Sequence, residues 1–155
     1  MAKMKINFKG FDSVLKTINE MGLNAHGAME KALLDCHELV TKQIREAVRR
    51  GVVVNTKNGT WQTMINLDKT NELKDSLYSV PVVNWTGETA SIMVGFDQDK
   101  SMHATYLMIT GNPYMTPSKE LYNAIYGTKT KKAIRDIQEK ALMQVIEGGV
   151  KWSKN

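Results

Sequence analysis

The sequence has few of the residues that build cross-links or metal sites. Among its 155 residues there are one cysteine, Cys36, and three histidines. A single cysteine excludes an internal disulfide framework and a cysteine-rich zinc module. His26 and His37 are eleven residues apart in a segment with a helical pattern. About 16 Å of helix would separate them, so we expect them not to share a metal ion, and we expect no metal centre.

Long apolar runs are also missing. No run approaches the roughly 20 residues of a membrane-spanning helix. The first nine residues alternate between apolar and polar types, whereas an export signal has a continuous apolar segment. Hydrophobic residues make up 42% of the chain and charged residues 24%, close to the average of globular proteins. We expect a soluble, reduced, globular protein with no membrane partner.

The pattern contains no recognisable catalytic set. Cys36 and His37 are neighbours, so on a helix their side chains would point about 100° apart and could not act as nucleophile and base. Cys36 falls on an apolar stripe, which predicts a buried, inert thiol. Gly148-Gly149 follows a helical pattern, whereas a phosphate-binding glycine loop precedes a helix. We expect no catalytic residue, no cofactor and no enzyme.

The net charge of +5 is concentrated in two clusters of cations. Arg45, Arg49 and Arg50 lie at the expected end of a helix, where cations interact favourably with the helix dipole. The second cluster opposes the dipole because it lies at an expected helix start; it consists of Lys129, Lys131, Lys132 and Arg135. Either this cluster is an ordinary solvated face, or it contacts a polyanion or an acidic partner.

Apolar residues at spacings of three and four predict helices over 12–22, 25–50, 116–125 and 129–147. We expect Asp12 to cap the first helix. We also expect Gly148-Gly149 to end the last one. The chain is then a single domain over 1–149 with a flexible C-terminal tail over 150–155.

Strands are predicted over 2–9, 77–83 and 88–96. We expect the last two to pair through a turn at 84–87. Pro81 has no amide hydrogen, so its strand should lie at a sheet edge or carry a bulge. The predicted fold is α+β: a small antiparallel sheet packed against one long and several shorter helices.

Residues 51–69 predict a long loop or hairpin arm. Asn58-Gly59 is a tight-turn signal between valine-rich and tryptophan-containing runs. An isolated hairpin is marginal in water, so the arm either folds back on the core or waits for a partner. Polarizable methionines in expected loops are further interface candidates. The candidate interface residues are Val52, Val53, Val54, Trp61, Met64 and Met102.

Several short motifs occur in a distinctive order along residues 3–147. Phe11-Asp12 and Leu15 precede the long helix, and Thr70-x-x-Leu73-x-x-Ser76 follows the arm. Two more motifs precede the C-terminal helices. The first is residues 106–111, which begin with tyrosine and end with glycine, and the second is the Pro-Tyr-Met-Thr-Pro run at 113–117. This order resembles the tail-completion or head–tail joining family of long-tailed bacteriophages, also described as minor tail components.

The sequence departs from the family pattern at three places. Asn71 stands where glycine is usual, which is tolerable because asparagine also adopts positive φ. Met108 stands where an acidic residue is common, and the 51–69 loop is longer than usual. These departures concern loop contacts more than the fold.

The resemblance implies a structural virion protein, assembled in the host cytoplasm. It implies a homo-oligomeric ring, a hexamer, in the neck between tail and capsid. The expected partners are the tail tube or tail terminator protein and the capsid connector proteins, with no specific nucleic-acid binding. The alternative is a small basic domain that binds nucleic acid or a host component.

Overall fold

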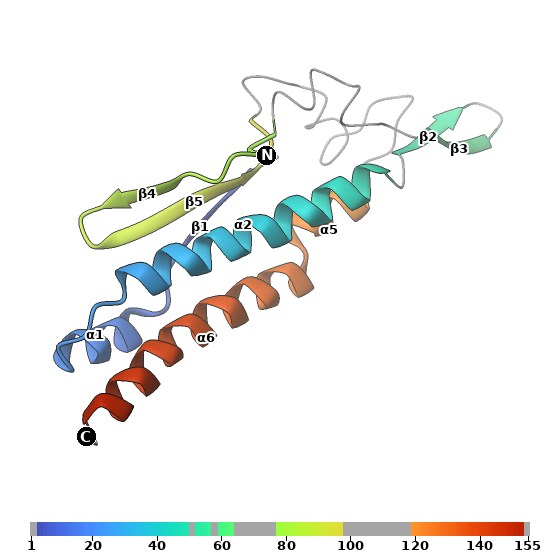
Figure 1. The fold of residues 1–155 in the computed structure, drawn as a ribbon. Coiled ribbons are helices and arrows are strands. Elements are labelled where there is room, and N and C mark those ends of the chain that lie inside the picture. Colours follow the sequence, from blue (N-terminus) through green and yellow to red (C-terminus); the bar gives the residue numbers. More distant parts are fainter. Residues whose placement is uncertain (1–2, 50–51, 57–58, 64–76, 98–118, 154–155) are drawn as a thin grey trace.

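The computed structural model describes residues 3–49, 52–56, 59–63, 77–97 and 119–153 (Figure 1). The fold is α+β, as the sequence predicts. Its elements are β1 (Lys3–Asn7), α1 (Asp12–Glu20), α2 (His26–Arg49), β2 (Val52–Thr56), β3 (Gly59–Thr63), β4 (Val83–Thr86), β5 (Thr89–Gly95), α5 (Lys119–Tyr126) and α6 (Thr128–Ser153).

The main sheet has three antiparallel strands in the order β1-β5-β4. Ile6 lies opposite Ile92, and Lys5 lies opposite Met93. Successive residues of a strand point to opposite faces, so the buried residues Ile6, Ala90 and Ile92 share one face. The other face carries the lysines of β1 and polar residues of β5, which confirms the alternation predicted for both strands.

Helix α2 lies at the centre of the molecule. Figure 1 shows it between the sheet and α6, and it contacts β5, α5 and α6. Its fully buried residues include Leu33, Cys36, Val40 and Ile44, which recur at spacings of three and four. Burial of each large aliphatic side chain contributes about 1.5–3 kcal/mol to folding. The long helix predicted over 25–50 is confirmed and organises the core.

Two side chains cover the outer edge of β1. The Tyr126 hydroxyl donates a hydrogen bond to the Lys3 carbonyl, and Gln138 Nε2 donates one to the Asn7 carbonyl at 2.7 Å. Burial raises the pKa of Tyr126, so this hydroxyl keeps its proton at neutral pH. The β1 edge is therefore closed by α5 and α6, whereas in the described part of the chain no strand pairs with the outer side of β4.

The hairpin of the main sheet differs from the prediction. The predicted strand 77–83 is wrong in its bounds, because β4 covers Val83–Thr86 and the turn is Gly87-Glu88. Gly87 has φ +64°, and tight hairpin turns favour such positive φ values. Leu77 forms only an isolated bridge with Phe96, because the chain between it and Val83 leaves the ladder.

A bulge around Pro81 explains that departure. Leu77 is opposite Phe96 and Val83 is opposite Ile92, so five residues, 78–82, oppose only three, 93–95. Proline cannot donate to the ladder, and the excess residues loop outward. The alternative that Pro81 accompanies a bulge is confirmed.

The predicted start of α1 and the predicted end of α6 need correction. Helix α1 begins at Asp12 itself, with Phe11 as N-cap and no side-chain cap bond, so the prediction that Asp12 caps the helix is wrong. Helix α6 continues through Gly148-Gly149 to Ser153, so the predicted end at the glycines is wrong. Glycine is tolerated inside a helix at a cost of about 1 kcal/mol, and residues 150–153 extend the helix instead of beginning a tail.

The predicted hairpin is confirmed as a separate two-stranded sheet. β2 pairs with β3 in antiparallel register, with Val54 opposite Trp61. Neither strand joins the main sheet. Figure 1 shows the hairpin beyond the C-terminal end of α2, at the opposite end of the molecule from α1.

Candidate interaction surfaces

The only cysteine is unsuited to nucleophilic chemistry. Cys36 has no exposed surface, and its sulfur lies 3.8 Å from the Ile134 carbonyl oxygen. Burial, with a smaller contribution from the Asp35 carboxylate, raises the pKa of the Cys36 thiol to about 12. The reactive thiolate is therefore scarce at neutral pH. The prediction of a buried thiol is confirmed.

The two described histidines serve different structural contacts. His37 is buried, and its Nε2 lies 2.6 Å from the Tyr78 carbonyl oxygen, so this nitrogen carries the proton and donates. The contact fixes the chain just before the bulge at Pro81. His26 is exposed, and its ring lies 4.9 Å from the Trp85 ring. Among the described residues, no group of three or more His, Cys, Asp or Glu could hold a metal ion.

One hollow lies between the first half of α2 and the second half of α6. It encloses about 540 Å³. Small residues such as Gly27, Ala28 and Ala32 form one wall, while Lys31 and Lys140 lie at its rim with Asp35. Lys31 Nζ is 3.2 Å from the Asp35 carboxylate. The hollow has no converging set of acids and bases, so it gives no reason to assign catalysis.

The bulge around Pro81 exposes two large apolar side chains. Val80 is 72% exposed and Val82 is 57% exposed, higher than any other large hydrophobic residue that the structure describes. They precede β4, whose outer side pairs with no strand in the described part of the chain. We call Val80, Pro81 and Val82 the valine bulge. The sequence did not reveal it as a surface, because the valine-rich run 77–83 was predicted to be a strand.

The predicted interface residues fall partly on the hairpin. Val52, Val53 and Val54 lie in β2, and Trp61 lies in β3. Met64 and Met102 lie outside the described residues. The structure therefore places four of the six on one two-stranded element that stands apart from the main sheet.

The predicted basic cluster lies on the exposed side of the first turns of α6. All four cations are exposed; they are Lys129, Lys131, Lys132 and Arg135. At 100° per residue, Lys131 and Arg135 share the side of α6 that carries Gln138, whose amide contacts β1. The Arg135 guanidinium also lies 5.9 Å from the centre of the Phe11 ring. These contacts bring two of the four cations next to the N-terminal strand.

The N-terminal segment carries three more lysines, two in β1 and Lys9 in the turn that follows it. Lys3, Lys5 and Lys9 are all exposed, and the first two lie on the outer face of the sheet. Lys5 and Lys9 also line a hollow of about 440 Å³ with Asn7, Ser91 and Thr86. Their alternation is visible in the sequence. What the sequence could not show is that Gln138 of α6 hydrogen-bonds to the Asn7 carbonyl at the edge of β1.

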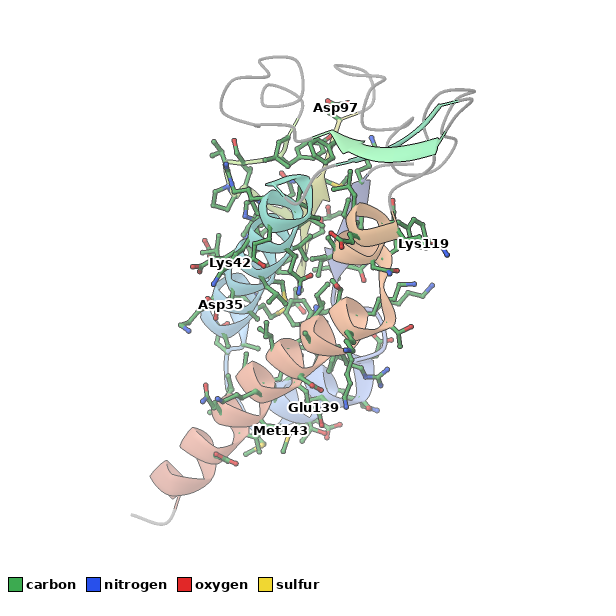
Figure 2. All side chains as sticks on the ribbon, turned by 90° about the vertical axis from the view of Figure 1, so that its right-hand side faces the viewer. Asp35, Lys42, Asp97, Lys119, Glu139 and Met143 are labelled. Carbon is green, nitrogen blue, oxygen red and sulfur yellow. The ribbon has the colours of Figure 1, made fainter. Side chains whose placement is uncertain are left out.

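Helix α2 carries exposed charges of both signs. Figure 2 shows Asp35 and Lys42 on the α2 flank, away from Lys119 on α5. Helix α6 presents Glu139 and Met143 along its exposed side.

Within the described residues, no helix combines the length and apolarity needed to cross a membrane.

Comparisons of this chain with protein-family models, with curated proteins and with solved structures found no match.

Proposed function

We propose that this protein is a structural assembly subunit without catalytic activity. Specifically, it acts as a tail-completion or head–tail joining component of a long-tailed bacteriophage. It forms a homo-oligomeric ring of six subunits in the neck, where it contacts the tail tube or tail terminator and the capsid connector. The resemblance of the motif order to that family supports the phage assignment.

The observation that carries the proposal is the isolated hairpin. β2 and β3 pair with each other and with no other described strand, and an isolated two-stranded sheet is marginal in water. Three consecutive valines put apolar residues on both faces of any strand that they form. Such a hairpin gains stability when it packs against a neighbouring subunit.

The unpaired edge of β4 supports the same proposal. A free sheet edge can accept a strand from another chain, and this edge follows the exposed valine bulge. The hairpin and the β4 edge lie on different parts of the molecule (Figure 1). A donor and an acceptor on different surfaces produce head-to-tail contacts, which close into rings when the rotation between subunits permits.

Replacing residues 52–63 with a short Gly-Ser linker tests the proposal. We expect the variant to keep its helical circular dichroism and its cooperative unfolding, because β2 and β3 form a sheet of their own and pair with neither the main sheet nor its edges. It should remain monomeric under conditions in which the unaltered protein forms rings by light scattering and electron microscopy. In a phage lacking the native protein, it should fail to join tails to heads.

Hydrogen exchange on the isolated monomer is a second test of the hairpin's role in assembly. We expect amides of β2 and β3 to exchange far faster than those of α2 and to become protected on assembly. Strong protection of the hairpin in a monomer would remove the reason for assigning it to an interface. An unaltered oligomeric state in the linker variant would contradict the proposal directly.

A further inference from the structure

We propose that the lysines of residues 3–9 and the cations at the start of α6 form one binding surface for the phosphate backbone of double-stranded nucleic acid. We call Lys3, Lys5, Lys9, Lys131 and Arg135 the basic face. This proposal does not depend on the assembly role of the hairpin, which lies on other residues. Its partner is identified by charge alone and not by base sequence.

The two halves of the basic face are held together by hydrogen bonds from α5 and α6 to the edge of β1. Tyr126, the last residue of α5, bonds to the Lys3 carbonyl. Gln138, three turns further along, bonds to the Asn7 carbonyl. Lys131 and Arg135 lie between these two anchoring points, so the first turns of α6 run beside the strand that carries Lys3 and Lys5.

The cations are available to a ligand. All five are exposed. Lys16–Glu20 and Lys31–Asp35 form ion pairs on α1 and α2, away from the residues of the basic face. The carboxylate of Asp12 lines the hollow beside Lys5 and Lys9. On α6, Asp136 directly follows Arg135 and Glu139 lies one turn further on. Five cations against these three carboxylates leave an excess of positive charge.

The spacing of the charges suits an extended polyanion better than a small anion. Lys3 and Lys5 are two residues apart on a strand, which is about 7 Å. Lys131 and Arg135 are four residues apart on a helix, which is about 6 Å. The charges therefore form two short rows and do not converge on one point. Hydroxyl and amide groups of Thr86, Ser91 and Asn7 line the adjoining hollow, and such groups also contact phosphate oxygens.

A salt titration with matched variants tests the proposal. The probe is a fluorescent 20-base-pair duplex in two unrelated sequences, and the readout is anisotropy of the full chain at rising salt. With five phosphate contacts, we expect the logarithm of the association constant to fall with a slope of about −4.5 against the logarithm of salt concentration. The two sequences should bind equally.

The test variant is K3Q/K5Q/K131Q and the matched control is K31Q/K42Q/K140Q, whose lysines lie on α2 or face it from α6. Both remove three positive charges. The test variant should lose about 2.7 from the magnitude of the slope and at least tenfold in affinity at 50 mM salt. The control should retain the slope of the unaltered protein. Thermal unfolding and light scattering of both variants check that folding and oligomeric state are unchanged.

Three results would overturn the proposal. One is the absence of duplex binding at 50 mM salt. Another is an equal loss in both triple variants, which would show attraction by net charge only. The last is binding of polyglutamate with the same affinity and salt slope as the duplex, which would assign the basic face to an acidic protein.

Discussion

At the scale of single residues, Cys36 shows how burial governs reactivity. It lies on the face of α2 that packs into the core, and its pKa is raised to about 12. An unfolded thiol ionises near its ordinary value of about 8.5. As pH rises above that value the unfolded state loses a proton that the folded state retains, so folding becomes less stable up to the folded pKa.

We therefore expect the free energy of unfolding to decline more steeply between pH 9 and 11 in the unaltered protein than in Cys36→Ala. Urea unfolding at a series of pH values measures both curves, and the difference between them isolates the thiol from lysines and tyrosines. Labelling by a thiol reagent at pH 8 should be slow until urea is added. Rapid labelling of the folded protein would contradict the burial of Cys36.

Two glycines provide a second test at this scale: Gly127, between α5 and α6, and Gly148, inside α6. A Cβ atom on Gly127 would lie 2.5 Å from the Asn123 carbonyl oxygen, whereas one on Gly148 would meet nothing within 4 Å. Gly127 also accepts a hydrogen bond from the Lys131 amide at the α5–α6 junction. A side chain at this junction would therefore collide with the backbone of the last turn of α5.

Gly127→Ala should lower the free energy of unfolding by about 1–3 kcal/mol, within the range of clashes that force backbone shifts. Gly148→Ala is the matched control and should be neutral or stabilising by up to about 1 kcal/mol. Chemical denaturation of both variants gives the comparison. Equal effects at the two positions would mean that the junction can relax at little cost.

At the scale of elements, the valine bulge is the feature that a sequence pattern conceals. Val80, Pro81 and Val82 precede β4 and project from the sheet because proline interrupts the ladder. Exposed apolar groups beside an unpaired strand edge favour association between chains. The bulge should therefore contribute to the interface of the assembled protein and little to the stability of the monomer.

The double variant V80K/V82K should keep the melting temperature within a few degrees and shift the protein toward monomer in light scattering. Met143→Lys is a suitable control, since Met143 is an exposed apolar residue on α6, away from the sheet edge. Loss of assembly in the control as well would point to a general effect of added charge. Unchanged assembly in V80K/V82K would exclude the bulge from the interface.

Local patterns predicted the elements better than their ends. The alternation of β1 and the spacing in α2 are long and regular, so they specified the buried faces Ile6 and Leu33 correctly. The bounds of β4 were missed because the valines around Pro81 are as apolar as a strand. The end of α6 was missed because glycine, although weakly helical, does not by itself stop a helix that packs against its neighbours.

At the scale of the whole molecule, the surfaces depend on packing that no local pattern contains. The cations of α6 were evident in the sequence, and so was the row of lysines in β1. Their union into a basic face follows from Tyr126 and Gln138, which bond to backbone groups more than 120 residues away in the sequence. Long-range contacts of this kind set the surfaces, and for that reason the hairpin, visible locally, was predicted while the basic face was not.

The two margins of the main sheet also differ in a way that limits growth. Side chains of α5 and α6 occupy the backbone acceptors on the β1 margin, so that margin cannot template another strand. In the proposed assembly, each molecule then has one acceptor, the β4 edge, and one donor, the β2–β3 hairpin. Growth through both margins of the sheet is therefore blocked. Under the proposed assembly each molecule adds only from hairpin to β4 edge, and the rotation between neighbouring subunits decides whether the chain of contacts closes into a ring.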